Sequence, residues 1–293
     1  MHLETITCLA AVVTAAAAAA GGFLARGSTA VPAAAWAAAA AVALACEAGW
    51  RAAGGLGDPA AQASARMLAA ALAVCPAMSV LGAKRPQHGV WQLIVATLAC
   101  VLALPAVSAV LVRPGDMPDP HFLERCFLPL LVAVGWMNFV GTRHGLAATL
   151  VAAGQAGLMV PFLPGVSPGP SDPRLDAIAA VLVAAGALLA AAQSACRPAV
   201  PGTRRGLAAA IDRPFLALRE TLGAAWTLRI AERFNAVAEA RGWPCRLRFT
   251  GLELTADQGG DWERDALRCS RSILRRFVSV GWLERHGGIR QVV

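Results

Sequence analysis

An eleven-residue stretch, GWMNFVGTRHG (135–145), gathers an amide, a hydroxyl, an arginine and a histidine directly after an apolar run. Such side chains can bind a polar ligand or transfer a proton. With Gln155 of the next apolar run, Asn138 and His144 form a candidate polar pocket that would open to the cytoplasm. The competing interpretation is a helix end, because a helix beginning at Pro120 would be about 33 Å long here, enough to leave a membrane. We favour the helix end, with Asn138 bonded to a neighbouring helix.

A second group of chemically capable residues lies near the C-terminus, where four arginines recur at helical spacing. On a helix they fall within about 60° of one another, beside an apolar face. Such a basic amphipathic helix suits anionic lipid headgroups or an acidic protein partner, and attachment to a membrane disfavours nucleic acid as the partner. The competing interpretation is a solvated helix face. The anion- or lipid-binding candidates are Arg264, Arg268, Arg271 and Arg275.

Patterns typical of catalysis are weak. Residues 165–169 read Gly-Val-Ser-Pro-Gly and match GxSxG, but a nucleophile elbow needs a strand before the serine and a helix after it, and prolines flank this one. Glu124 and Arg125, with His121 one turn earlier, could meet an external ligand. Neighbours in sequence point to different sides of a helix, however, so we expect salt bridges or headgroup contacts instead. We predict no catalytic residue.

Metal and cofactor chemistry also lacks a sequence signal. The eight cysteines are scattered singly and mostly within apolar runs, as expected of small buried side chains rather than metal ligands or disulfides. HExxH, a Walker P-loop and GxGxxG are missing from the sequence. We therefore predict neither a metal site nor a cofactor.

The elements that position these residues are predominantly apolar. The chain has 293 residues, of which 57% are hydrophobic and only 15% charged, unlike a typical soluble protein. A spanning helix needs about 20 mostly apolar residues. Seven runs qualify, although the first two are rich in alanine and six spans remain compatible with the sequence. The expected spans are 5–25, 31–49, 66–83, 90–112, 121–141, 145–163 and 175–195.

Charge divides the chain into two parts. Residues 1–196 hold nine basic against eight acidic residues, whereas residues 197–293 hold seventeen against ten. Such asymmetry is typical of a membrane body with a basic appendage. We expect an all-α membrane protein with two domains, a polytopic transmembrane helical domain at 1–197 and a small, mainly helical, basic soluble domain at 198–293.

Loop chemistry predicts helix starts and orientation. Three alternate loops carry Asp-Pro before an apolar run, at 58–59, 119–120 and 172–173, where Asp caps a helix and Pro fits its first turn. Loops on the opposite side, with the start of the tail, hold seven basic residues; the Asp-Pro side holds five, namely Arg51, Arg66, Arg113, Arg125 and Arg174. Because basic loops stay in the cytoplasm, we expect the N-terminus outside and the tail in the cytoplasm of a bacterial inner membrane.

Within the tail, the pattern predicts two long helices and a strand. A continuous apolar stripe follows Asp212-Arg213-Pro214 and ends at Arg241-Gly242, which predicts one helix. Residues 245–250 alternate like a strand for which no partner is visible. A second helix is expected from Asp261 to about Val280, with acids in its first turn and arginines later.

The function hypotheses follow from where charge is missing. No ionisable residue lies in the middle third of any expected span, and coupled transporters usually need such residues. We therefore favour a non-enzymatic membrane scaffold or interaction protein with a basic cytoplasmic docking domain. The alternative is a channel or carrier for a small neutral solute, which would require Thr97, Asn138, Gln155 and Gln193 to line one cavity. A membrane-embedded enzyme would require Asn138, His144 and Glu124 to converge.

Overall fold

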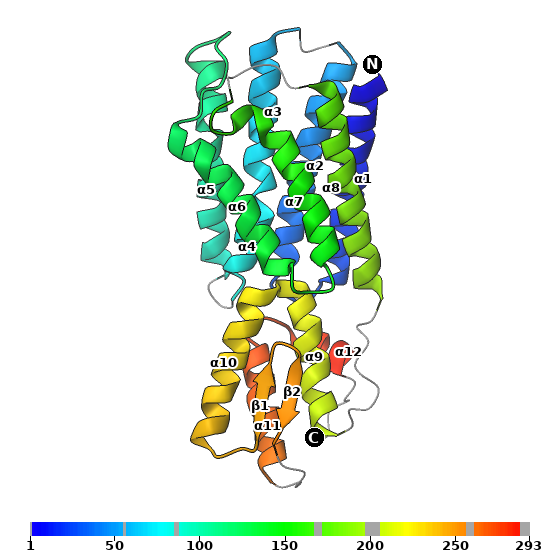
Figure 1. The fold of residues 1–293 in the computed structure, drawn as a ribbon, viewed down its shortest axis with the longest axis vertical. Helices are drawn as coiled ribbons and strands as arrows, with labels where there is room; N and C mark the ends of the chain where they lie inside the picture. The colour runs from blue at the N-terminus through cyan, green and yellow to red at the C-terminus, as the bar shows by residue number, and fades with distance from the viewer. Residues whose placement is uncertain are drawn as a thin grey trace.

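The computed structural model describes residues 2–54, 57–84, 88–166, 172–196, 206–255 and 261–287. Its long helices form a bundle, and the C-terminal residues pack against one end of that bundle (Figure 1). Within the described residues, seven helical segments are long and apolar enough to cross a membrane. The prediction of an all-α polytopic membrane protein with about seven spans is therefore confirmed. The division of the chain at residue 197 stays a prediction, and residues 197–205 lie outside the described part.

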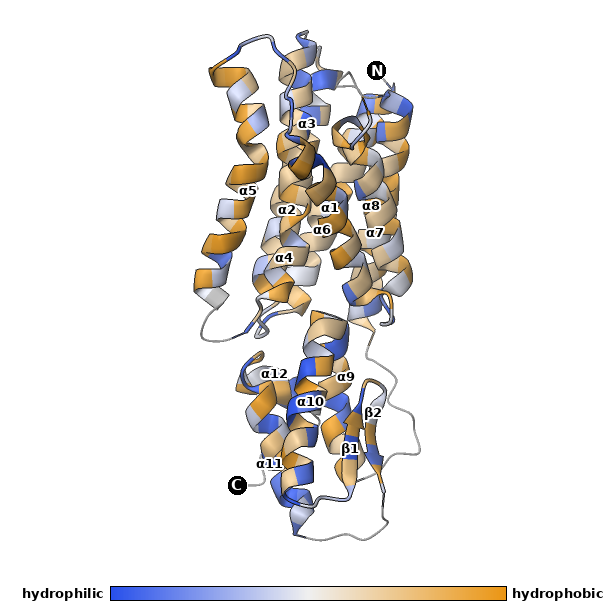
Figure 2. Cartoon of the chain, turned by 60° about the vertical axis from the view of Figure 1, so that its left-hand side comes forward, coloured by the Kyte–Doolittle hydropathy of each residue, from blue (hydrophilic) through white to orange (hydrophobic). Residues whose placement is uncertain are grey.

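The bundle consists of nearly parallel and antiparallel helices joined by short connections. Many leucine, valine and phenylalanine side chains of the bundle are exposed, as expected where helices face lipid rather than water. Hydrophobic residues predominate along the bundle helices (Figure 2). The bundle elements are α1 (His2–Leu24), α2 (Val31–Ala52), α3 (Pro59–Ala73), α4 (Cys75–Leu81), α5 (His88–Leu111), α6 (Phe122–Phe139), α7 (Gly145–Met159), the short η1 (Val160–Phe162) and α8 (Pro173–Ala195).

The third span differs from its sequence prediction at the start. It begins at Pro59 rather than at residue 66, because the Asp58 side chain accepts a hydrogen bond from the Ala60 N–H and caps α3. The span is interrupted at Val74, and α4 restarts with Pro76 in its first turn. Proline lacks the N–H that a continuous helix would need at this position. Arg66 therefore lies two turns inside the span, not at its end.

Of the other two Asp-Pro loops, one forms the predicted aspartate cap and the other uses a different N-cap residue. Asp172 caps α8 by accepting from the Arg174 N–H, as predicted. At the start of α6, His121 is the N-cap, and its backbone N–H donates to the Glu124 carboxylate in a capping box. Asp119 instead pairs with Arg125, their closest N and O atoms being 2.9 Å apart.

Small residues allow the bundle helices to approach closely. At Gly186 of α8, an added Cβ would lie 2.7 Å from the Ala147 carbonyl oxygen, and at Gly154 of α7 it would lie 2.5 Å from that of Ala179. Helices in membranes associate largely through such close contacts, because lipid is as apolar as their side chains. The alanine-rich composition thus serves packing between helices.

The described residues of the C-terminal region, 206–255 and 261–287, form four helices and a hairpin. Its elements are α9 (Leu207–Leu222), α10 (Ala224–Ala240), β1 (Cys245–Arg248), β2 (Gly251–Leu254), α11 (Trp262–Leu274) and α12 (Val280–Gly287). The hairpin supplies the strand partner that the sequence left open: β1 and β2 are antiparallel, with Cys245 opposite Leu254 and Leu247 opposite Leu252.

Two helix predictions in this region were wrong in extent. The single helix expected over 212–241 is two helices, because Gly223 adopts a φ of 78° that lets the chain reverse between α9 and α10. Pro214 lies inside α9, which starts at Leu207 rather than at the proline. The last expected helix ends at Leu274, six residues before Val280, and a turn separates it from α12.

One apolar core joins the C-terminal region to the bundle. It includes Phe215, Leu218, Phe234 and Trp282 together with small residues from the end of the bundle. Backbone hydrogen bonds cross the same boundary, from the Thr29 N–H to the Phe277 carbonyl and from the Ser279 N–H to the Gly27 carbonyl. The C-terminal region is therefore held against one end of the bundle by both apolar and polar contacts.

Candidate functional site: a buried charge cluster and an apolar cavity

Four ionisable side chains meet inside the bundle. In this charge cluster, Arg66 Nη1 lies 2.7 Å from Asp176 Oδ1, and Arg66 Nη2 lies 3.1 Å from Glu47 Oε2. Arg51 completes the ring, with its Nη1 3.1 Å from Asp176 Oδ2 and its Nε 2.9 Å from Glu47 Oε1. Two arginines thus face two carboxylates, and the charge cluster is neutral as a whole.

Local sequence explains how three helices bring these groups together. Glu47 and Arg51 are one turn apart in α2 and so lie on the same face. Asp176 sits in the first turn of α8, after the Asp172 cap, and Arg66 lies about 10 Å along α3. All four positions are therefore near the end of the bundle that is remote from the C-terminal region.

Burial makes this cluster energetically sensitive. Glu47 and Arg66 are each 2% exposed and Asp176 is 1% exposed. Buried charges are tolerated only when they are paired and hydrogen-bonded, and removing one partner typically costs about 3–5 kcal/mol. Substitutions in the charge cluster should therefore be tolerated better when they remove one positive and one negative charge together than when they remove a single charge.

The charge cluster was not predicted from the sequence. Arg51 and Arg66 were expected in loops on the Asp-Pro side, whereas the structure places both inside the bundle. Two signals were available in the sequence: the i,i+4 spacing of Glu47 and Arg51, and the Asp58-Pro59 cap that sets the start of α3. Ionisable groups within spans are by default candidates for function.

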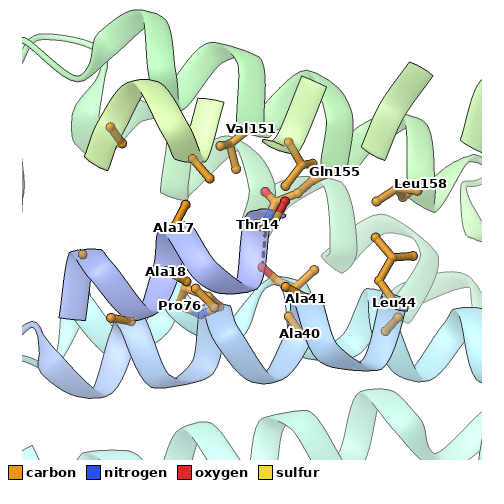
Figure 3. A pocket seen from close by; sticks show the side chains of 18 of the residues that line it. Thr14, Ala17, Ala18, Ala40, Ala41, Leu44, Pro76, Val151, Gln155 and Leu158 are labelled. Atoms are coloured by element: carbon orange, nitrogen blue, oxygen red, sulfur yellow. Dashed lines mark hydrogen bonds between the residues drawn. The ribbon is translucent and has the colours of Figure 1, made fainter. Parts of the chain in front are cut away.

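An apolar cavity of about 280 Å³ extends from the charge cluster between α1, α2, α3, α7 and α8. Its lining is mostly alanine, with Leu44 and Arg66 toward one end and Gly21 toward the other. Figure 3 shows side chains of α1 and α2 facing Val151 and Leu158 of α7 across this space. The alanines leave the space unfilled because they end at Cβ.

Two polar side chains in the cavity wall bond to neighbouring backbone. The Thr14 hydroxyl donates to the Ala10 carbonyl at 2.9 Å, and the Gln155 amide donates to the Ala73 carbonyl at 2.8 Å. Arg66 uses both Nη atoms on the carboxylates, and its Nε–H, which is fully enclosed, has no hydrogen-bond partner among the described residues. A buried donor without a partner is costly, which adds to the sensitivity of the charge cluster.

The three residues of the candidate polar pocket engage different partners. Asn138 bridges the turn between α9 and α10, donating to the Leu222 carbonyl and accepting from the Ala225 N–H, both at 3.0 Å. His144 Nδ1 lies 2.9 Å from the Gln193 side-chain oxygen. Gln155 lines the apolar cavity. The structure therefore gives Asn138 a bond to a neighbouring helical element, and brings Gln155 alone of the three to the cavity.

His144 is a buried histidine immediately before the start of α7. It is 8% exposed and directly precedes α7. Burial lowers the pKa of His144 below its usual value, because desolvation disfavours the charged imidazolium, while the bond to Gln193 acts in the opposite direction. The neutral form is therefore favoured at this junction.

The channel and enzyme hypotheses each required a set of polar residues to come together, but these residues lie apart and have different partners. Of the four polar side chains expected in one cavity, Gln155 lines it; Thr97 bonds to its own helix at Leu93, Gln193 to His144, and Asn138 to the C-terminal region. Glu124 caps the opposite end of α6 from Asn138. Ser167 of the GxSxG match lies outside the described residues.

The arginines of α11 border a groove. Arg264, Arg268 and Arg275 are exposed, Arg271 is half-buried, and Arg268 also lines a groove of about 460 Å³ between α10 and α11. The groove adds further arginines from both helices and one acid, Asp265, which lies 3.6 Å from Arg241 and 3.7 Å from Arg268. We call the combined set the arginine surface: Arg233, Arg241, Arg264, Arg268, Arg271, Arg275 and Arg276.

Comparison with known proteins found no relative. The chain matches no protein-family model, no curated protein and no solved structure.

Proposed function

We propose that the protein is a membrane-anchored scaffold that binds an acidic protein segment on its arginine surface. The observation that carries this proposal is the groove between α10 and α11, which four arginines line with one carboxylate, Asp265, while the arginine surface continues along α11 with three further arginines. Like charges at this density repel one another, and an anionic partner would relieve that repulsion.

The direction of α11 favours a polypeptide over a membrane surface as the partner. Phe277, just beyond α11, bonds to Thr29 at the end of the bundle, whereas Arg241 and Asp265 meet at the other end of α11. In Figure 1, α11 extends away from the bundle. From Arg264 to Arg275 is about 16 Å along that direction. A flat bilayer would meet one end of such a row, but an acidic segment could follow all of it.

The proposed orientation puts the arginine surface in the cytoplasm. The positive-inside bias is stronger once Arg51 and Arg66 are removed from the outer loops, because both are paired inside the bundle. Three basic residues then remain on the Asp-Pro side, Arg113, Arg125 and Arg174. A bacterial inner membrane is the proposed location, with membrane lipids around the bundle.

The test is binding of a fluorescent ten-residue polyglutamate peptide to the full-length protein in nanodiscs of neutral phosphatidylcholine. We expect binding that weakens steeply with salt, as exposed charge contacts do. The variant Arg233→Glu/Arg268→Glu should weaken it at least tenfold. The matched control is Arg246→Glu, which changes an exposed arginine of β1 outside the arginine surface and should leave affinity within about twofold.

Three outcomes would overturn the proposal. One is a lack of peptide binding by the unaltered protein at low salt. Another is an equal loss in the Arg246→Glu control. The third is binding of anionic phosphatidylglycerol vesicles, or of single-stranded DNA, that is stronger than peptide binding and depends on the same two arginines.

A further inference from the structure

We propose that the acidic segment is phosphorylated, and that its phosphoserine or phosphothreonine binds in the groove between Arg233 and Arg276. This inference rests on the proposed function, since it names a chemical group that the docked segment brings to the groove. It is carried by the division of the groove into two halves, only one of which holds a carboxylate, and by the hydrogen-bond donors of the other half.

The two halves of the groove differ in charge. α10 leaves the bundle and α11 returns to it, so the two helices are antiparallel (Figure 1). In the half farther from the bundle, Arg241 and Arg268 lie 3.6 Å and 3.7 Å from Asp265. Arg233 lies eight residues, or about 12 Å, back along α10, and Arg276 lies eight residues after Arg268. Arg233 and Arg276 therefore line the half nearer the bundle.

This nearer half has positive charge without a counterion. Among the described residues, neither Arg233 nor Arg276 forms an ion pair, and Asp265 is engaged by the other two groove arginines. Both side chains are exposed, so their guanidinium groups can turn toward a ligand in the groove. Ser272 also lines the groove, one turn before Arg276, and adds an exposed hydroxyl that can donate a hydrogen bond.

Charge and geometry favour a phosphate group over a carboxylate between these arginines. A phosphorylated serine carries a charge of about −1.5 to −2 near neutral pH and three acceptor oxygens, whereas a glutamate carries one charge and two oxygens. A guanidinium group can donate two parallel hydrogen bonds to a phosphate, so two arginines can bind one phosphate group from different sides. The farther half, where Asp265 already offsets one charge, suits a single carboxylate.

The same division favours a phosphorylated polypeptide over a lipid headgroup. A polypeptide carries a phosphate and a carboxylate on one chain, and the two halves begin about 12 Å apart along α10, which corresponds to about four residues of extended backbone. A phosphodiester headgroup brings only one negative charge on its phosphate. The groove also follows α10 and α11 away from the bundle, and hence away from the membrane (Figure 1).

The test compares three fluorescent ten-residue peptides for binding to the full-length protein in nanodiscs of neutral phosphatidylcholine. One peptide is polyglutamate, and the other two carry phosphoserine or unmodified serine at the fifth position. We expect the phosphoserine peptide to bind about tenfold more tightly than polyglutamate, because its additional charge lies between two unpaired arginines. The unmodified serine peptide should bind no more tightly than polyglutamate.

Two double variants locate the preference for phosphoserine. Arg233→Gln/Arg276→Gln should reduce it to less than about twofold, because the phosphate loses both guanidinium groups. The matched control is Arg264→Gln/Arg275→Gln, which removes the same charge from exposed positions of the arginine surface that do not line the groove. This control should weaken all three peptides to a similar degree and keep the preference. Thermal unfolding of both variants checks that the C-terminal region stays folded.

The outcomes separate this inference from the proposed function. Equal binding of the phosphoserine and polyglutamate peptides would overturn the phosphate site and leave acidic docking in place, whereas no binding of any peptide would overturn both. Loss of the preference in the Arg264→Gln/Arg275→Gln control as well would assign it to overall charge and overturn the groove site. Displacement of the phosphoserine peptide by phosphatidylglycerol vesicles or by inorganic phosphate at lower concentration than by polyglutamate would overturn a polypeptide occupant.

Discussion

At the scale of single residues, the balance of charge among Glu47, Arg51, Arg66 and Asp176 controls what the bundle tolerates. Each arginine contacts both carboxylates, so no member has only one partner. A network of this kind neutralises charge locally while binding three helices together. It differs from a proton pathway, in which ionisable groups would follow one another across the membrane.

We expect Asp176→Asn to destabilise the bundle strongly, by about 3–5 kcal/mol, because it leaves two arginines against one carboxylate in a buried site. The double variant Arg51→Gln/Asp176→Asn removes one charge of each sign and keeps the Arg66–Glu47 pair. It should be more stable than Asp176→Asn alone. Thermal unfolding in detergent, followed by tryptophan fluorescence, measures both. A double variant less stable than Asp176→Asn alone would contradict the importance of net neutrality.

At the scale of elements, the turn between α9 and α10 connects the C-terminal region to α6. Gly223 reverses the chain with a φ of 78°, and an added Cβ there would collide with Asn138. The Asn138 amide satisfies the last carbonyl of α9 and an early N–H of α10, two groups that helix ends leave unpaired. Asn138 therefore acts as a cap for both helices from outside the C-terminal region.

We expect Asn138→Leu to speed hydrogen exchange at residues 222–226, because the Ala225 N–H loses its acceptor and the Leu222 carbonyl its donor. The matched control is Asn235→Leu. Asn235 uses the same two-sided amide geometry on the Leu247 backbone, within the C-terminal region. Its loss should speed exchange in β1 and leave the turn protected. Unchanged exchange at the turn in Asn138→Leu would disprove the capping role.

The elements that could be predicted from sequence are those determined by local composition. Apolar length located all seven spans, and Asp58 and Asp172 marked helix starts, because these signals act within a few residues. The charge cluster required pairing between α2, α3 and α8, which no local pattern specifies. The cavity required knowledge of which alanines face one another. Gly223 was visible within the apolar stripe, but the stripe reveals neither its positive φ nor the contact that Asn138 of α6 makes beside it.

At the scale of the whole molecule, the structure has two distinct ends. The charge cluster and the Asp-Pro loops occupy one end of the bundle, and the C-terminal region with its arginine surface occupies the other (Figures 1 and 2). The cavity runs inside the bundle between these ends, since its lining extends from Arg66 to Gly21 near the last turn of α1. The helices that line it include α2, α3 and α8, which carry the charge cluster.

Orientation in the membrane is the prediction that tests this arrangement as a whole. In a cysteine-free background in intact cells, single cysteines replace Gly57 and Asp116 at the cluster end, and Glu239 at the end of α10; all three positions are exposed. We expect a membrane-impermeant thiol reagent to label the cysteines at 57 and 116, because basic loops are retained in the cytoplasm and the proposed orientation puts the arginine surface on that side. The cysteine at 239 should react only after the membrane is permeabilised, which also controls for its accessibility. Labelling of 239 alone in intact cells would place the arginine surface outside and remove the basis for a cytoplasmic acidic partner.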